Sequence, residues 1–217
     1  MSPRFKAGSL TKMSRKVARH IVEINPRFER VIELSGICPL FGKEQITKRK
    51  ESNFAALASS ILSQQLSTKA AATIIGRVEA LSGGSLQAAK IAKLSTQTLR
   101  AAGCSNSKAR AITELAIACA NKEIPISALH RLDDESIMKH LLPRFGIGQW
   151  TVEMFLMFQL GRADIWPVGD LGVRRGWEKI HGMSDDITPK HLQELGEAFS
   201  PYRSHVAWYC WRAVEVL

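Results

Sequence analysis

The sequence predicts an all-α protein, and three observations support this prediction. Apolar residues recur at intervals of three and four over most of the chain, which is the spacing of one face of a helix. No stretch alternates apolar and polar residues over the length of a strand, and no internal repeat is present. With 217 residues and 45% hydrophobic content, the chain can also bury a sizeable core.

Capping residues mark where several of these helices begin and end. Asn25 followed by Pro26 is typical of a helix N-cap and its first residue, and Gly36 ends that helix. Ser52 is a further N-cap, and Asp133 or Asp134 caps the helix that leads into a Gly-Ile-Gly turn. We expect helices at about residues 14–24, 26–35, 52–63, 68–81, 86–94, 96–102, 108–120, 134–145, 149–160, 171–181, 189–199 and 201–217, with a single turn at 129–132.

Residues 137–160 predict a helix-hairpin-helix motif. The first helix runs to Phe145, the turn is Gly146-Ile147-Gly148, and the second helix begins at about Gln149. The two glycines let the backbone adopt positive φ and approach a partner with no Cβ in the way. The amides that open the second helix have no partner within it and form a site for an anion. The hairpin is therefore expected to bind a phosphate.

One carboxylate follows this hairpin closely. Asp170 ends the Pro-Val-Gly-Asp segment that comes after the second helix. A single Asp in a loop is more often a turn residue or a helix cap than a catalytic group. Its place just after a phosphate-binding hairpin favours the catalytic reading.

The charge distribution favours a polyanionic partner. The formal net charge is +10, and residues 1–50 carry 12 basic against 4 acidic side chains, whereas residues 151–217 carry 7 against 9. An excess of this size is typical of nucleic-acid-binding domains, although a solvated basic surface gives the same pattern.

Two motifs and three further stretches carry a resemblance. LPRFGIGQWT at residues 142–151, followed by PVGD at 167–170, resembles the signature of the helix-hairpin-helix DNA glycosylase superfamily, and Trp150 makes it similar to the DNA-3-methyladenine glycosylase II group. That group's intercalating segment, second DNA-contacting loop and C-terminal helix resemble residues 61–71, 103–112 and 201–211.

The resemblance implies two helical lobes with a cleft between them. Residues 1–48 and 172–217 would form the terminal lobe, and residues 49–171 the central lobe that contains the hairpin. The basic run Lys48-Arg49-Lys50 marks the first boundary, and Asp170 would lie at the mouth of the cleft.

The resemblance also implies how the chain would hold DNA. A base must leave the stack before it can be excised, and a side chain must fill the gap. Gln65 and Leu66 match that wedge, although Leu66 could equally be a core residue. The other implied DNA contacts are Cys104, Ser105, Lys108, Gly146, Ile147 and Gly148.

Asp170 matches the catalytic acid of the family, and Trp150 and Trp211 match aromatic residues of its base pocket, to which Trp166 and Tyr202 are candidate additions. The carboxylate would stabilise positive charge on the sugar as the glycosidic bond breaks. Bifunctional members carry a Lys where this chain has Trp150, so no AP-lyase activity is expected. The implied pocket residues are Trp150, Trp211, Trp166 and Tyr202.

No cofactor is expected apart from a possible hairpin cation. Cys38, Cys104, Cys119 and Cys210 lack the close spacing of an iron-sulfur site and are expected to be reduced thiols. Relatives hold a monovalent cation on hairpin carbonyls, which would be those of Phe145 and Ile147 binding Na⁺ or K⁺.

These patterns together favour a monomeric, monofunctional glycosylase that excises alkylated bases of the 3-methyladenine and 7-methylguanine type from duplex DNA. Two alternatives stay open: a nearly inert protein that binds damaged or abasic DNA, and a glycosylase for another lesion such as uracil, an oxidised purine or an etheno adduct. The chain shows no membrane-spanning run and no secretory signal, so we expect it in the cytoplasm and nucleoid of a bacterium or the nucleus of a eukaryote.

Overall fold

A computed structural model describes residues 12–40 and 51–217 of the chain. These residues form α-helices, short 3₁₀ turns and one π-helix, and they contain no β-strand. The predicted all-α fold class is therefore confirmed. None of the helices in the described ranges is both long and apolar enough to cross a lipid bilayer.

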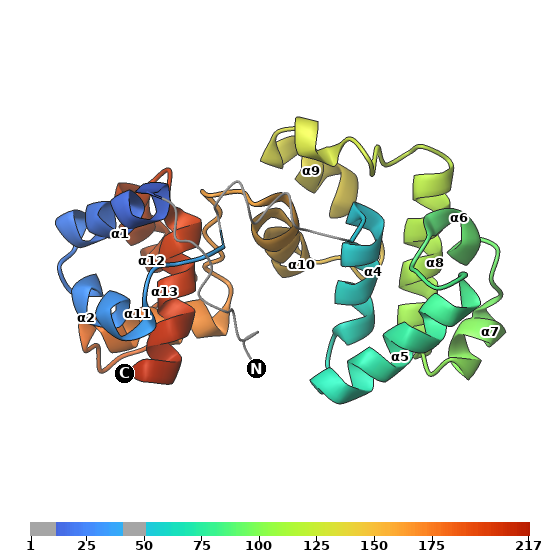
Figure 1. Ribbon diagram of the computed structural model, residues 1–217, viewed down its shortest axis with the longest axis horizontal. Coiled ribbons are helices and arrows are strands. Elements are labelled where there is room, and N and C mark those ends of the chain that lie inside the picture. Colours follow the sequence, from blue (N-terminus) through green and yellow to red (C-terminus); the bar gives the residue numbers. More distant parts are fainter. Residues whose placement is uncertain (1–11, 41–50) are drawn as a thin grey trace. The chain divides into compact units, whose positions relative to one another are not determined.

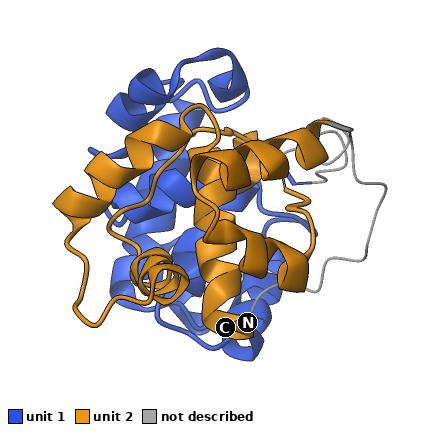
Figure 2. Cartoon of the chain, turned by 90° about the vertical axis from the view of Figure 1, so that its left-hand side faces the viewer, with its two compact units in different colours: residues 1, 50–155 blue, residues 2–49, 156–217 orange. Residues whose placement is uncertain are grey.

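The chain divides into two compact units, coloured separately in Figure 2. The central unit is Lys50–Phe155, and the terminal unit combines Ser2–Arg49 with Leu156–Leu217. Residues 156–171, which the sequence assigned to the central lobe, thus lie in the terminal unit and bring Asp170 with them. The basic run Lys48-Arg49-Lys50 falls outside the described residues.

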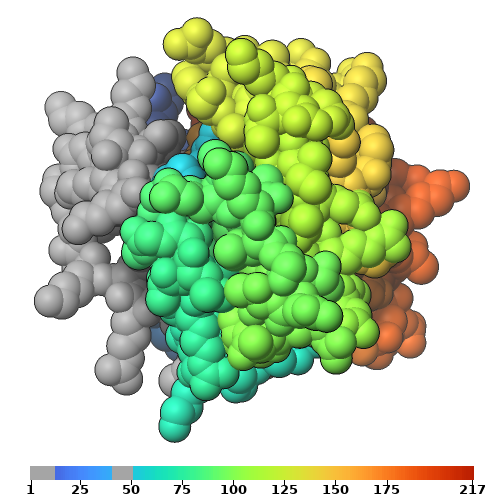
Figure 3. Space-filling view, turned by 90° about the vertical axis from the view of Figure 1, so that its right-hand side faces the viewer, coloured from blue at the N-terminus to red at the C-terminus, as the bar shows by residue number. Residues whose placement is uncertain are grey.

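The central unit is built around one long helix, α8 (Asn106–Ala120), which packs against α4, α6 and α7 (Figure 1). Its buried residues include Ile112 and Leu115, which share the core with Leu57 and Ile61 of α4. Side chains from α5 to α8 lie together on the face shown in teal to yellow-green in Figure 3. The other elements are α4 (Asn53–Ser63), α5 (Thr68–Leu81), α6 (Ala88–Ile91), α7 (Thr96–Ala101), η1 (Leu129–Arg131), α9 (Asp134–Leu141) and α10 (Gln149–Met154).

Serine and aspartate caps start the helices of this unit. Ser52 Oγ accepts the amide of Ala55 at 3.1 Å, as predicted. Of the two predicted candidates Asp133 and Asp134, Asp133 is the cap, and its Oδ1 accepts the amide of Ser136 at 2.7 Å. The same arrangement recurs at Ser67, Ser95 and Ser105. Each cap satisfies an amide that the helix itself leaves without a partner.

The first helix of the hairpin is shorter than predicted. It ends at Leu141 rather than Phe145, because Pro143 has no N–H to continue the ladder of helical hydrogen bonds. Tight turns follow, in which the amides of Arg144 and Ile147 donate to the carbonyls of Leu141 and Arg144. The second helix, α10, continues into the π-helix η2 (Phe155–Leu160), and along the chain the central unit ends at Phe155.

Helices α11 (Leu171–His181) and α13 (Arg203–Val216) form the centre of the terminal unit and lie side by side (Figure 1). Tyr209 of α13 is fully buried, and its hydroxyl accepts the amide of Cys38 at 3.1 Å. Phe28 packs edge-on against Trp177 in the same core. The remaining elements are α1 (Lys12–Ile24), α2 (Phe28–Ser35), α12 (Pro189–Gly196) and η3 (Glu197–Phe199).

Candidate functional site

Asp170 lies at the N-cap of α11, at the end of a turned loop. Its own amide donates to the carbonyl of Pro167 at 2.9 Å, and its Oδ1 accepts the amide of Val173 at 2.9 Å. The residue is therefore a helix cap, which is the more common of the two roles considered for it, a structural one and a catalytic one. Capping also fixes the direction of the carboxylate, because the helix terminus holds one of its oxygens.

A second donor binds the same oxygen of Asp170. The indole Nε1 of Trp211, on α13, donates to Oδ1 at 2.9 Å. Phe158 of the π-helix stacks on the Trp211 ring with centroids 5.7 Å apart and planes 28° apart. Phe158 was not among the residues predicted for the site, because the sequence shows only an aromatic residue within an apolar helix. The structure shows that its side chain is 39% exposed. The terminal unit thus brings one carboxylate and two stacked aromatic rings together.

Two other aromatic residues predicted for the base pocket have packing roles in the structure. Trp166 is only 6% exposed, and its Nε1 donates to the carbonyl of Leu192 at 2.9 Å, so its ring belongs to the core of the terminal unit. Tyr202 makes edge contacts with His20 and His205, which hold its ring against α1 and α13. Trp166 is therefore not a pocket residue, because a buried and hydrogen-bonded indole cannot receive a base.

The two hairpin glycines differ in conformation. Gly146 has φ +79°, and a Cβ there would lie 2.6 Å from the Cβ of Ala111, so only glycine fits against α8. Gly148 has φ −93°, which any residue can adopt, and a Cβ there would meet no atom within 4 Å. The prediction of positive φ at both positions was therefore wrong for Gly148. Gly148 is the N-cap of α10. Because it has no side chain, the space in front of the first turn of the helix is open.

The carbonyl of Gly146 accepts a hydrogen bond, whereas among the described residues those of its two neighbours in the hairpin do not. The carbonyl of Gly146 accepts the side-chain amide of Gln64 at 3.1 Å. Within residues 12–40 and 51–217, those of Phe145 and Ile147 accept no hydrogen bond. Two hard oxygens without a donor suit a monovalent cation, so the residues fit the ion that the resemblance implies.

On the adjoining helix, Trp150 is 48% exposed.

The predicted wedge lies in the loop between α4 and α5. Gln65 has φ +57°, a left-handed conformation that is uncommon for a residue other than glycine, and its side chain is exposed. Leu66 is 39% exposed, so the alternative that it is a core residue does not hold. The loop presents both side chains outward.

The second predicted DNA-contacting loop differs from expectation. Cys104 is buried, and burial raises the pKa of its thiol, so it is not placed to enter a DNA stack. Ser105 caps α8 by accepting the amide of Lys108 at 3.3 Å. The Nζ of Lys108 donates to the carbonyls of Leu62 and Gln64 at 2.8 and 2.6 Å, so it does not point out to a phosphate.

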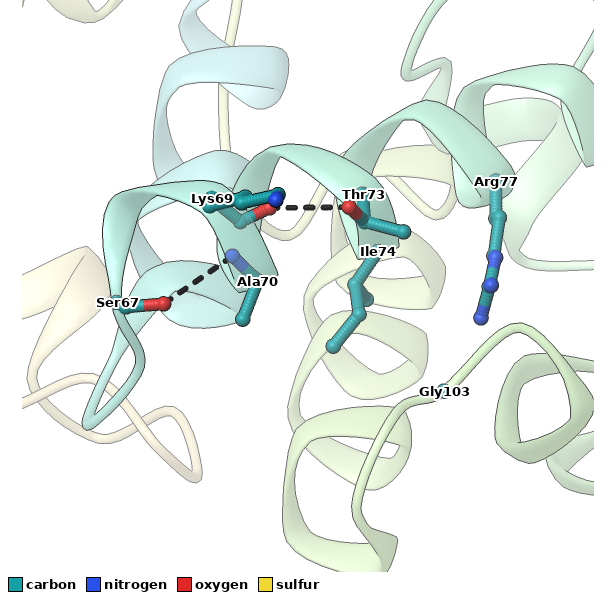
Figure 4. Close-up of a pocket in the computed structure, with 7 residues that line it drawn as sticks. All are labelled: Ser67, Lys69, Ala70, Thr73, Ile74, Arg77 and Gly103. Carbon is teal, nitrogen blue, oxygen red and sulfur yellow. Dashed lines mark hydrogen bonds between the residues drawn. The ribbon is translucent and has the colours of Figure 1, made fainter.

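A shallow groove of about 420 Å³ lies along α5 beside the Gly103 loop (Figure 4). Ala70 and Ile74 form an apolar wall, and Arg77 extends toward Gly103. Lys69 and Arg77 are exposed, and within the described residues neither has an ion-pair partner. Because Lys69 and Arg77 are two turns apart on one face of α5, the groove carries a positive strip.

Comparison with known proteins decides the family. Residues 58–201 match the family described as HhH-GPD superfamily base excision DNA repair protein. The chain belongs to the HhH-GPD superfamily. The matched residues include the wedge loop, the hairpin and Asp170, whereas Trp211 lies beyond them.

Similar members of the HhH-GPD superfamily come from several organisms. DNA-3-methyladenine glycosylase 1 of Schizosaccharomyces pombe is 30% identical over 93% of this chain and 88% of its own. The crystal structure of a DNA-3-methyladenine glycosidase from Bacillus halodurans is 35% identical with a TM-score of 0.80, covering 91% of this chain and 88% of that one. The structure of the S. pombe 3-methyladenine DNA glycosylase in complex with abasic DNA is 30% identical with a TM-score of 0.77, covering 90% and 95%.

These comparisons confirm the predicted resemblance to alkylation-repair glycosylases of the helix-hairpin-helix superfamily. The roles of individual HhH-GPD site residues stay predictions. The structure brings Asp170 and Trp211 together in the terminal unit, and Gln65, Leu66 and the hairpin within the central unit.

Proposed function

We propose that this chain hydrolyses the N-glycosidic bond of alkylated bases, of the 3-methyladenine and 7-methylguanine type, in duplex DNA and so begins base excision repair. The observation that carries the proposal is the carboxylate of Asp170 held 2.9 Å from the indole nitrogen of Trp211, whose ring stacks on Phe158. This group combines an anion with an aromatic surface, which are the two features that excision of a cationic base requires.

Asp170 is the group we assign to the chemistry. As the bond between sugar and base breaks, positive charge develops on the sugar, and a fixed carboxylate stabilises it. The same carboxylate can orient or deprotonate the attacking water. The donors from Val173 and Trp211 both bind Oδ1, so the carboxylate does not have to reorganise during the reaction.

Trp211 and Phe158 are the residues we assign to the base. A purine that alkylation has made cationic is attracted to the face of an aromatic ring, by about 0.5 to 2 kcal/mol depending on its exposure to water. An alkylated base is also a good leaving group, so a single carboxylate is a sufficient catalyst. The stacked pair therefore favours alkylated over neutral bases.

We propose that the reaction ends with base removal. Strand cleavage by a bifunctional glycosylase needs an amine that forms a Schiff base with the sugar. In this chain the matching hairpin position is Trp150, and the segment from Pro143 to Met154 contains no lysine. The abasic product should stay intact until alkali or another enzyme cleaves it.

Phosphate binding is assigned to the hairpin and to the groove on α5. The open space before α10 at Gly148 admits a phosphate near the helix terminus. The carbonyls of Phe145 and Ile147 would hold a monovalent cation, which supplies a positive charge for the same DNA strand. Lys69 and Arg77 replace Lys108 as the cations of the neighbouring surface, because the Lys108 ammonium is bound to carbonyls.

Release of 3-methyladenine and 7-methylguanine from methylated duplex DNA tests the proposal. Asp170→Asn keeps an N-cap and an oxygen for the Trp211 N–H but removes the charge, so base release should fall at least about 100-fold. Asp185→Asn, which removes an exposed carboxylate from the same unit, should leave the rate unchanged. Strand breaks should appear only after alkali treatment.

Other outcomes would overturn particular parts of the proposal. No base release by the natural protein, together with tight binding to an abasic duplex, would indicate a damage-binding protein. Release of uracil, an oxidised purine or an etheno base instead would change the substrate. Strand breaks without alkali would contradict the monofunctional assignment.

A further inference from the structure

Three interactions converge on the loop that carries Gln65 and Leu66. The ammonium of Lys108 donates to the carbonyls of Leu62 and Gln64. The side-chain amide of Gln64 donates to the carbonyl of Gly146. Residues from α8, from the end of α4 and from the hairpin are thereby connected within the central unit.

The conformation that these contacts surround is an unfavourable one. Gln65 has φ +57°, where an L side chain crowds its own backbone. Such a residue keeps its conformation only when its surroundings hold it there. The backbone bonds nearby are few: the amides of Gln64 and Leu66 donate to the carbonyls of Ile61 and Ser63 at 3.3 and 3.2 Å.

Lys108 supplies hydrogen-bond donors to carbonyls that have no backbone donor in the part of the chain that the structure describes. The carbonyls of Leu62 and Gln64 lie at the C-terminal end of α4, where the helix has no donors left for its last carbonyls. A cation at this end also complements the helix dipole. Burial lowers the pKa of Lys108, so its ammonium gives up part of its hydration to occupy this position. A lysine that served only to attract phosphate would stay in water.

We propose that Lys108 and Gln64 are positioning residues. They hold Gln65 and Leu66 in the conformation that exposes both side chains, from which they can enter the DNA stack. Lys108 fixes the carbonyl on the N-terminal side of Gln65, and Gln64 ties the same segment to the hairpin. This inference rests on the proposed function and on the wedge role that the resemblance implies for Gln65 and Leu66. It replaces the DNA contact that the resemblance implies for Lys108.

Fluorescence of 2-aminopurine tests wedge insertion without any catalysis. The probe is placed opposite a stable abasic-site analogue in a duplex, where unstacking by an inserted side chain raises its emission. At saturating protein, Lys108→Met should lower the equilibrium constant for insertion about fivefold, the factor that corresponds to about 1 kcal/mol at 25 °C, and the rise in emission should fall with the inserted population. Lys90→Met, which removes an exposed lysine of α6, should not reduce it.

Gln64→Met keeps the proposal testable if Lys108→Met does not fold. Its bond to Gly146 is exposed, so the variant should fold, and it should also reduce the rise in emission. Gln65→Asn supplies a rescue, because Asn tolerates left-handed backbone better than Gln and keeps an amide. In the Lys108→Met background it should restore part of the signal.

The salt dependence of binding separates the two roles of Lys108. Loss of a phosphate contact would make the plot of log affinity against log salt shallower, reducing the size of its slope by about one. A positioning role leaves the slope unchanged while the emission falls. A shallower salt dependence together with normal emission would overturn the proposal. Because the assay uses an abasic duplex, its result does not depend on which base the enzyme releases.

Discussion

Gly176 of α11 lies directly against the backbone of Cys210 on α13. A Cβ at position 176 would be 1.8 Å from the carbonyl oxygen of Cys210, which no real side chain can occupy. This contact sets the separation of the two helices that carry Asp170 at the end of one and Trp211 on the other. The site therefore depends on a residue that touches neither of its side chains.

Gly176→Ala should destabilise the protein by about 3 kcal/mol or more, because the clash is with backbone and cannot be relieved by rotating a side chain. Gly76→Ala is the matched control: it lies within α5, and a Cβ there meets no atom within 4 Å. That substitution should be neutral or stabilising. Urea unfolding of both variants measures the difference, and equal midpoints would contradict the packing argument.

Trp211→Phe should lower kcat about tenfold while KM changes little. The substitution keeps an aromatic ring for the base but removes the N–H that donates to Asp170, and hydrogen bonds to charged groups contribute about 1.5–3 kcal/mol. Steady-state kinetics on a methylated duplex would measure it. Trp208→Phe, on the same helix, tests for a general loss of packing. A similar kcat for both variants would show that the Trp211 hydrogen bond does not matter.

Lys69→Met and Arg77→Met should each reduce the salt dependence of DNA binding. If each cation contacts one phosphate, the slope of log affinity against log salt should fall by about one per substitution. Lys90→Met should leave the slope unchanged. Binding to an abasic duplex from low to moderate salt gives these values, and unchanged slopes for both groove variants would remove the groove from the DNA footprint.

Acid should weaken the terminal unit through His205. Burial lowers the pKa of His205 from 6.5 to about 4, so between these pH values the unfolded chain binds a proton that the folded chain does not. The stability is therefore complete above pH 6.5 and falls as the pH drops to 4, by about 3 kcal/mol in total.

His205→Gln should flatten this dependence. The measurement is the urea midpoint of both proteins at pH 4, 5, 6 and 7. The quantity to compare is the change of the midpoint with pH, not its absolute value. Burial also lowers the pKa of His181, so part of the slope should persist in the variant. An identical pH dependence in the two proteins would exclude His205 as its source.

Much of the fold follows from short-range patterns. The caps at Ser52 and Asp133 act on amides three residues away, so their sequence signal is local. The prediction for Ser52 was right, and the structure decides between Asp133 and Asp134 in favour of Asp133. The predicted helices were found nearly throughout the described residues, and the main error in the hairpin was the end of α9. Pro143 carried the signal for that end, since it cannot donate the hydrogen bond that continues a helix.

The sequence by itself determined the helical class, the hairpin, the superfamily and the position of the candidate carboxylate. Only the tertiary structure decided where the side chains of these elements point. The bond between Trp211 and Asp170 spans 41 residues, and that between Lys108 and Leu62 spans 46. Such contacts depend on how distant helices pack, and local propensity does not encode packing. For the same reason Trp166, a plausible pocket residue in the sequence, lies in the core.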